Sequence, residues 1–240
     1  MLIRCWKGGL TVLIFVNAQL PQNAKSALER IAETIDFSAP GLLYDAVSAH
    51  PDLFFVQVGN KLIVAPNLPR KYVQLLAERD ISYIFGQSPV GFRYPESAKY
   101  NAVVTEKYFI HDHRISDPSL LEHVAGLEKI QVNQGYTRCN LLALGDTHFI
   151  TSDKGLYRTL HSLEMQVLFV DPKGIELPGF SHGFFGGACG LWQQTVYISG
   201  SLKHHSQGES IRQFIEAAGF NVEELYNGPL FDGGSIIFVG

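Results

Sequence analysis

The stretch DTHFITSDKGLYRTLHSLEMQVLFVDPKGIELPGFSHGFFGGACGLW, residues 146–192, contains the pattern that decides the fold. Leu156, Leu160 and Leu163 follow the 3.6-residue period of a helix with one apolar face. Three β-rich or apolar runs flank that helix, at residues 147–151, 167–170 and 190–193. The stretch therefore predicts a strand, a helix, a second strand, a long loop ending in a glycine turn, and a third strand.

The same unit occurs five times along the chain, at a spacing of about 40–50 residues that is typical of propeller-like and solenoid repeats. The five first strands are predicted in TVLIFVN from Thr11, KLIVAPN from Lys61, KYFIHD from Lys107, THFITSD from Thr147 and TVYISGS from Thr195. The second strands are predicted at residues 34–37, 81–85, 129–132, 167–170 and 221–225, and the third strands at residues 53–58, 102–105, 140–144, 190–193 and 235–239.

Each first strand is followed by a segment with one apolar face, as expected of a helix that packs on a sheet. Asp117 and Pro118 form a helix start in the third unit, and Gly219 is a helix C′ candidate in the fifth. The predicted apolar faces are Ala24, Ala27, Leu28 and Ile31; Val73, Leu76 and Ala77; Leu120, Leu121 and Val124; and Ile211, Phe214, Ile215 and Ala218.

Five such units must bury their sheets against one another, and closing the array into a ring protects its two ends. The predicted fold class is α/β: a five-bladed α/β propeller of pseudo-fivefold strand-helix-strand-strand units, in one domain over residues 1–240. The helices are expected to face outward. The third strands and the turns that lead into them are expected to surround the axis.

Composition excludes several classes of function. The formal net charge is -4 and no run of Lys or Arg occurs, so nucleic-acid binding is not expected. Cys5, Cys139 and Cys189 are widely spaced without a CxxC pair, which suits a reducing compartment, and a cytoplasmic location is predicted. No apolar stretch approaches the roughly 20 residues that span a bilayer, so no membrane association is expected. The opening, with Arg4 and Lys7 before an apolar run, leaves a short signal peptide as the alternative to a first strand.

The chain resembles the pentein superfamily over nearly its whole length. The resemblance rests on the five units, the run NLLALGDTHFITSD, the glycine pair Gly186-Gly187 and the closing DGGSIIFVG. Penteins are the α/β propellers of the guanidino-group modifying enzymes, namely arginine deiminases, dimethylarginine hydrolases and amidinotransferases. The chain looks like a small uncharacterised branch of that superfamily.

The resemblance implies a cysteine thiolate that attacks a guanidinium carbon, a histidine that exchanges protons, and carboxylates that bind the cation. The family places its nucleophile a few residues after a glycine pair in the last unit. Here Ser235 follows Gly233-Gly234, and no cysteine follows Cys189. The family histidine opens the third strand of the fourth unit, where this chain has Ala188-Cys189-Gly190, and the nearest histidine is His182.

The turns before the third strands are predicted to place polar side chains around one axial pocket. Cys189 and His182 are the predicted catalytic residues, and the predicted substrate-binding residues are His50, Asp52, Asn101, Asn140, Asp232 and Ser235. Several have structural alternatives: Asp52 and Asp232 are also typical turn residues, and Asn101 and Asn140 also suit hydrogen bonding to turn backbone. Cys189 and Cys139 also suit a role as small buried hydrophobic residues.

Two further histidine groups, His111-Asp112-His113 and His204-His205, lack the spacing of a zinc site, and surface or capping roles are predicted for them. No metal and no cofactor are expected. Two hypotheses for function remain open. One is an enzyme that acts on a guanidino, amidine or similar small cationic compound. The other is a non-catalytic protein of the same fold that binds a small molecule or a protein partner. The sequence does not indicate an oligomeric state.

Overall fold

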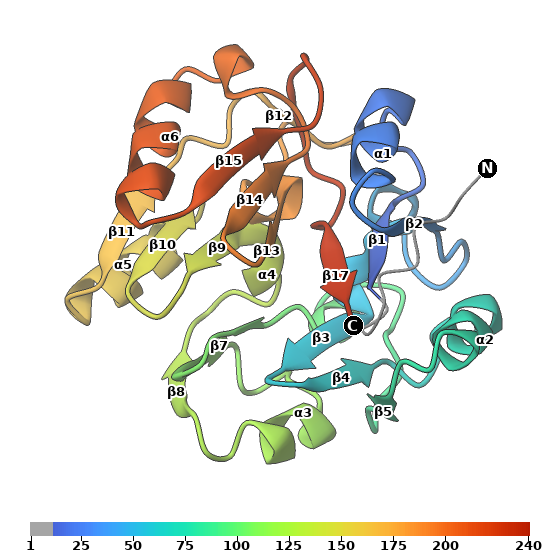
Figure 1. Cartoon of the computed structure of the whole chain (residues 1–240). Helices are drawn as coiled ribbons and strands as arrows, with labels where there is room; N and C mark the ends of the chain where they lie inside the picture. Colours follow the sequence, from blue (N-terminus) through green and yellow to red (C-terminus); the bar gives the residue numbers. More distant parts are fainter. Residues whose placement is uncertain (1–11) are drawn as a thin grey trace.

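A computed structural model describes residues 12–240 as a mixed α/β fold (Figure 1). The strands of this part of the chain form five three-stranded sheets and one two-stranded sheet. In every three-stranded sheet the first strand of the unit lies in the middle, pairs in parallel with the second strand and pairs antiparallel with a third strand. The strands follow one another along the chain as predicted, but each third strand pairs with the first strand of the following unit, which for β17 is the first unit, and not within its own unit.

The five first strands and five second strands begin within two residues of their predicted starts. The first strands are β1 (Leu13–Asn17), β4 (Lys61–Val64), β7 (Tyr108–His111), β10 (His148–Thr151) and β14 (Thr195–Ile198). The second strands are β2 (Glu33–Phe37), β5 (Tyr83–Phe85), β8 (Glu128–Gln131), β11 (Gln166–Phe169) and β15 (Asn221–Glu224). The two-stranded sheet was not predicted and pairs β12 (Ile175–Glu176) with β16 (Leu230–Phe231).

Four of the five third strands are shorter than predicted, because short helices and turns occupy the residues before them, and β13 has the predicted length. The strands are β3 (Phe55–Val58), β6 (Val103–Val104), β9 (Leu141–Leu144), β13 (Cys189–Trp192) and β17 (Ile237–Val239). Three of them follow a helical turn directly or within two residues: η2 (Pro51–Leu53), α4 (Thr137–Asn140) and η4 (Gly186–Ala188). These turns carry several of the predicted site residues.

The last strand of the chain, β17, pairs antiparallel with the first, β1, with Leu13 opposite Val239. The two ends of the described chain therefore belong to one sheet (Figure 1). Each of the other four third strands forms a sheet with the two strands that come next in sequence. The third strand β17 instead forms its sheet with β1 and β2, from the start of the described chain.

One α-helix connects the first and second strands of each unit, as predicted. These helices are α1 (Gln22–Leu28), α2 (Arg70–Glu78), α3 (Pro118–His123), α5 (Lys154–Ser162) and α6 (Gly208–Ala217). Asp117 caps α3 by accepting a hydrogen bond from the Ser119 N–H, and Gly219 follows the cap of α6 with a φ of 88°. Both predicted helix ends are confirmed. The remaining short helices are η1 (Asp45–Val47), η3 (Glu96–Ala98) and η5 (Leu202–His204).

Three residues predicted on buried helix faces are exposed. Ile31 and Leu163 are 41% and 46% exposed, because α1 and α5 end before them. In α2 the buried positions are Tyr72 and Leu76, and Ala77 faces solvent. The remaining helix positions that face the sheets, such as Leu156, Leu160 and Ile211, are fully buried and contribute to the apolar core.

None of the helices in residues 12–240 combines the length and the hydrophobicity required to cross a bilayer. Cys5, Arg4 and Lys7 lie outside the described residues, so the signal-peptide alternative is not resolved by the fold. The assignment of residues 1–240 to one domain and the cytoplasmic location stay predictions.

Candidate functional site

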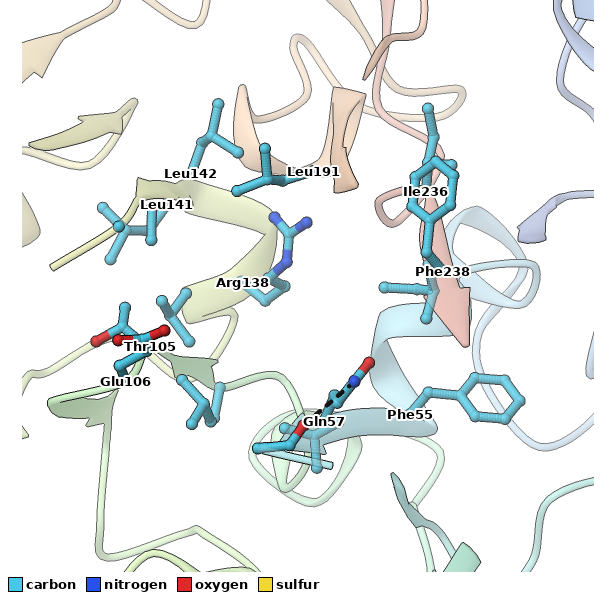
Figure 2. Close-up of a pocket in the computed structure, with 18 residues that line it drawn as sticks. Phe55, Gln57, Thr105, Glu106, Arg138, Leu141, Leu142, Leu191, Ile236 and Phe238 are labelled. Carbon is cyan, nitrogen blue, oxygen red and sulfur yellow. Dashed lines mark hydrogen bonds between the residues drawn. The ribbon is translucent and has the colours of Figure 1, made fainter. Parts of the chain in front are cut away.

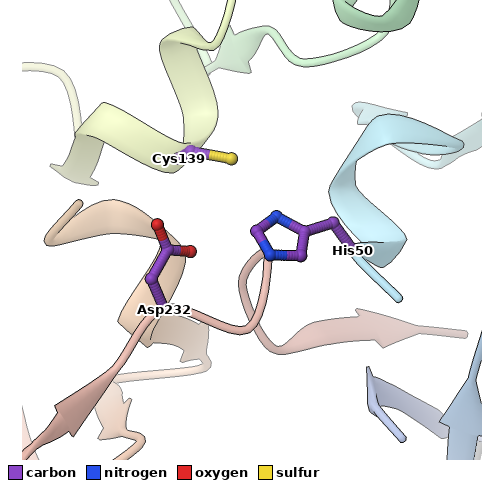
Figure 3. A group of neighbouring side chains, drawn as sticks. All are labelled: His50, Cys139 and Asp232. Carbon is purple, nitrogen blue, oxygen red and sulfur yellow. The ribbon is translucent and has the colours of Figure 1, made fainter. Parts of the chain in front are cut away.

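Six polar side chains from the turns before the third strands meet inside the fold. This group, called the hub cluster below, consists of His50, Asp52, Asn101, Cys139, Asp232 and Ser235. All six are buried, with at most 3% of the residue exposed. Figure 3 shows that His50, Cys139 and Asp232 approach from separate segments of the chain and point toward one another. Five of the eight predicted site residues belong to the cluster.

Asp52 is at the centre of the hydrogen bonding in the hub cluster. Its Oδ2 accepts hydrogen bonds from the Cys139 thiol at 3.1 Å and from the Ser235 hydroxyl at 2.8 Å. The Asn101 amide donates to the Asp52 carbonyl oxygen at 3.2 Å and to Cys139 Sγ at 3.4 Å, and it accepts from the Cys139 N–H at 3.1 Å. Charged acceptors form the stronger hydrogen bonds, so Asp52 holds the turns of three other units in place.

The fourth of the linked turns is η4, whose glycines allow close approach. The Ser235 N–H donates to the Gly187 carbonyl oxygen at 2.7 Å, and its hydroxyl also donates to the Gly186 carbonyl oxygen at 3.2 Å. A Cβ on Gly187 would overlap with the Asp232 carboxylate. Hydrogen bonds of this network therefore connect the turns that precede all five third strands.

Ser235 has a φ of 67°, in the left-handed region that non-glycine residues rarely adopt. Such backbone strain persists only where the surrounding structure imposes it, and it is frequent at functional sites. Ser235 directly follows the glycine pair Gly233-Gly234, and its hydroxyl donates hydrogen bonds to Asp52 and to the Gly186 carbonyl oxygen.

Asp232 is a buried carboxylate with an altered pKa. Burial raises its pKa from 3.8 to about 6, while the nearby His50 and the backbone N–H groups of Phe184 and Gly234 lower it. None of the ion pairs within residues 12–240 includes Asp232 or Asp52. The hub cluster therefore contains two carboxyl groups without a basic side chain paired to either.

Several polar atoms of the hub cluster have no hydrogen-bond partner. Both ring nitrogens of His50 and the Oδ1 atom of Asp52 are buried and unpaired. An unpaired buried polar group costs about 1–3 kcal/mol, so native structures contain few of them, and an unbound ligand or ion is one explanation. The unpaired atoms lie beside the thiol and the two carboxylates, which marks this cluster as the candidate site.

Cys139 is protonated in this closed arrangement. Burial raises the pKa of its thiol well above 9.0, and the negative charge of Asp52 raises it further. Burial also raises the pKa values of Tyr44 and Tyr136, and the nearby Cys139 makes a smaller contribution in the same direction to both. The two tyrosine hydroxyls lie 3.4 Å apart. We therefore place this tyrosine pair next to the cluster.

Three predicted site residues have other surroundings. Cys189 packs in an apolar core cluster, is 0% exposed, and burial raises its pKa to about 12. His182 is half-buried, and its Nδ1 contacts the carbonyl oxygen of the next residue, Gly183. No hydrogen bond joins the two in the described part of the chain. Asn140 donates to the Tyr136 carbonyl oxygen, so it bonds turn backbone as its structural alternative predicts.

The open pocket lies along the third strands and not among the predicted site residues. A cavity of about 610 Å³ is lined by residues of β3, β6, β9, β13 and β17, and Arg138 projects into it (Figure 2). None of the eight predicted site residues lines this cavity. Five of the eight lie in the closed hub cluster, while their neighbours Arg138 and Ile236 line the opening, and a role of the eight residues in a ligand site stays a prediction.

Surface or capping roles were predicted for the two histidine groups, and His111 and His205 lie buried and not at the surface. His111 is 0% exposed, and its two nitrogens lie near the Ser116 hydroxyl at 2.6 Å and the Gly135 carbonyl oxygen at 2.9 Å. His205 is 5% exposed and bonds the Asp171 carbonyl oxygen. Cys139 belongs to the hub cluster, although the sequence did not predict it as a site residue. The signal available was its place immediately before a third strand, equivalent to Asn101.

Residues 15–237 match the sequence model of a family described as "Family of unknown function (DUF6873)". The chain belongs to this family. No curated protein matches the chain.

Solved structures with the same fold are guanidino-group modifying enzymes. DDAH from Pseudomonas aeruginosa, a cysteine-to-serine mutant complexed with citrulline, is 8% identical, with a TM-score of 0.55 over 89% of this chain and 91% of that chain. Agmatine deiminase from C. jejuni is 8% identical, with a TM-score of 0.56 over 93% of each chain. SxtG, an amidinotransferase from Microseira wollei, is 11% identical, with a TM-score of 0.52 over 90% of this chain and 88% of that chain. The predicted resemblance to the pentein superfamily is confirmed at the level of the fold.

Proposed function

We propose that the chain is a five-bladed α/β propeller that binds a small guanidino or amidine compound at the hub cluster. The five sheets with one connectivity, the pairing of β17 with β1, and the hydrogen bonds that join the five turns all support ring closure. The solved structures with this fold, among them an amidinotransferase and an agmatine deiminase, support the class of ligand.

The observation that carries this proposal is the pair of buried carboxyl groups next to unpaired polar atoms. Asp52 Oδ1 and both nitrogens of His50 lack partners, and neither Asp52 nor Asp232 has an ion-pair partner in residues 12–240. A guanidinium group supplies a delocalised positive charge and several N–H donors in one plane, which suits two carboxylates. A bound cation of this kind would satisfy Asp52 and offset the cost of burying Asp232.

For a reaction, we propose Cys139 as nucleophile and His50 as the group that exchanges protons. Cys139 Sγ would attack the guanidinium carbon after its proton passes to His50, and His50 would return that proton to the departing amine. Water or an acceptor amine would then break the carbon–sulfur bond and regenerate the thiol. The positive charge of the bound substrate would favour the thiolate beside Asp52. The pair Cys189 and His182 stays a prediction, with less support because Cys189 packs in an apolar core cluster, whereas Cys139 Sγ lies within 4.8 Å of a ring nitrogen of His50.

Non-catalytic binding at the same cluster is the second candidate function. It is favoured by the raised pKa of Cys139, which keeps the thiol neutral near pH 7 in the closed arrangement. Binding without covalent chemistry needs only the carboxylates and the unpaired atoms, and a fold does not by itself imply a reaction.

The test compares agmatine with N-carbamoylputrescine, which has the same length but a neutral ureido group in place of the guanidinium. We expect agmatine to raise the melting temperature of the protein and the ureido compound to have little effect, because a ligand bound only to the native state stabilises it. Asp52→Asn should abolish the shift. Equal shifts from both compounds, or none from agmatine and related guanidino or amidine compounds, would refute the proposal.

Product analysis separates the two candidates. An enzyme should release ammonia or transfer an amidino group, and this activity should disappear in Cys139→Ala and persist in Cys189→Ala. If activity is lost only in Cys189→Ala, the nucleophile assignment is wrong. Binding without turnover in the presence of water and acceptor amines supports the non-catalytic candidate.

A further inference from the structure

Three potential metal ligands of different chemistry meet in the hub cluster. A ring nitrogen of His50, Sγ of Cys139 and a carboxylate oxygen of Asp232 all lie within 4.8 Å of one another. Figure 3 shows the imidazole, the thiol and the carboxylate directed at a common space between them. The three residues come from the turns of three separate units, so the arrangement is a product of the tertiary fold and not of a local sequence motif.

The buried and unpaired ring nitrogens of His50 are a second, independent observation that indicates a ligand in the hub cluster. Its residue is 1% exposed, yet neither ring nitrogen has a hydrogen-bond partner. A neutral imidazole has one donor and one acceptor, and burying both unpaired is costly. The other two buried histidines, His111 and His205, do have hydrogen-bond partners. A metal ion would bind one nitrogen of His50 and thereby compensate for its removal from water.

The type of ligand set narrows the type of ion. Imidazole, thiolate and carboxylate together are typical of Zn²⁺ and similar borderline-soft ions, whereas Mg²⁺ and Ca²⁺ take oxygen ligands. Zinc bonds of about 2.0–2.3 Å in a tetrahedral arrangement require ligand atoms about 3.3–3.8 Å apart. The observed limit of 4.8 Å thus requires only small side-chain movements.

Asp52 lies next to the three potential metal ligands. Its Oδ2 lies 3.1 Å from Cys139 Sγ, and its Oδ1 is buried and unpaired. This oxygen is in a position to act as fourth ligand or to accept a hydrogen bond from a water on the ion. Two carboxylates and one thiolate also supply the negative charge that a buried divalent cation needs.

We infer that His50, Cys139 and Asp232 bind a borderline-soft divalent metal ion such as Zn²⁺, with Asp52 beside it. Binding forms a bond from the metal to Cys139 Sγ and releases the thiol proton to solvent, so the uptake of each ion releases one proton from this group. The inference shares residues with the proposed guanidino site but does not rest on that function. The ion and the guanidinium would occupy the same space, so each should exclude the other.

The test uses the full-length protein after removal of metal with a chelator. We expect Co²⁺, as a spectroscopic substitute for Zn²⁺, to bind with one ion per chain and to produce the sulfur-to-metal charge-transfer absorption of a thiolate ligand. Cys139→Ser should abolish this absorption, and the matched variant Cys189→Ser should keep it. His50→Gln and Asp232→Asn should weaken Zn²⁺ binding at least tenfold, as measured with a competing chelator. Circular dichroism of each variant establishes that it is folded.

Two results would overturn the inference. One is the absence of stoichiometric Co²⁺ or Zn²⁺ binding and of proton release by the unmodified protein, a measurement that needs no variant. The other is a charge-transfer band that survives in Cys139→Ser, which would place the ion elsewhere. Agmatine binding is measured separately in metal-free protein. Metal binding without agmatine binding therefore refutes only the guanidino proposal, and the reverse refutes only the metal site.

Discussion

The buried carboxyl group of Asp232 should make the stability of the protein depend on pH in a specific way. Burial raises its pKa from 3.8 to about 6, so between these values the folded protein binds a proton that the unfolded chain has lost. The contribution of Asp232 to stability is therefore complete below about pH 3.8 and is lost as the pH rises through about 6. A shift of this size corresponds to about 3 kcal/mol.

Asp232→Asn removes this titration while preserving the size of the side chain. The Phe184 and Gly234 N–H groups donate to different oxygens of Asp232, and the substitution replaces one of these oxygens with an NH2 group that cannot accept. The variant therefore loses one hydrogen bond, which lowers its free energy of unfolding by a pH-independent amount of about 1 kcal/mol. In addition to that constant difference, we expect the free energy of unfolding of the wild-type protein to fall by about 3 kcal/mol relative to that of the variant between pH 4 and pH 7. Urea unfolding of the metal-free proteins, followed by circular dichroism at several pH values, measures the free energy of unfolding of both.

The control is Asp171→Asn, which removes the same charge at an exposed position and reports the effect of net charge alone. Other groups titrate over this range, but they are common to both proteins and largely cancel in the difference. A wild-type minus Asp232→Asn difference that stays constant from pH 4 to pH 7 would refute the reasoning, because it would mean that the fold does not raise the pKa of this carboxyl group.

Three further predictions concern packing, strain and access in the hub cluster. Gly187→Ala should destabilise the protein by about 2 kcal/mol or more in urea unfolding, because the added Cβ would overlap with the Asp232 carboxylate. The control is Gly126→Ala, where the added Cβ would enter open space and should change stability by less than about 0.5 kcal/mol. Equal effects of the two substitutions would contradict the close approach of Gly187 to Asp232. Ser235→Gly and Ser235→Ala both lose the hydroxyl, but only glycine adopts the φ of 67° without strain. The alanine variant should therefore be less stable than the glycine variant by about 1 kcal/mol. The opposite order in thermal unfolding would disprove the strain. Cys139 and Cys189 are 3% and 0% exposed, so a thiol reagent followed by mass spectrometry of peptides should modify both slowly in the native protein and quickly in urea; rapid native labelling of Cys189 would be inconsistent with its buried position.

Local features of the fold were predictable because their causes lie within a few residues. Apolar and β-rich runs predicted the starts of ten strands to within two residues. Asp117 predicted a helix start through its side-chain cap, and Gly219 predicted a helix end through its positive φ. The burial of Leu163 was wrong because the helix ends at Ser162, and periodicity alone does not indicate where a helix stops. The two-stranded sheet of β12 and β16 joins segments too short to have a period of their own.

The sequence by itself determined the repeated unit, the resemblance to the pentein superfamily and the polar character of the turns before the third strands. Only the tertiary structure decided which side chains meet. Asp52 and Ser235, 183 positions apart, share a hydrogen bond, while Cys189 turns into the apolar core and Cys139 joins His50 and Asp232. The physical reason is that periodicity and capping act over a few residues, whereas the side of a turn on which a thiol emerges depends on how the units pack against one another.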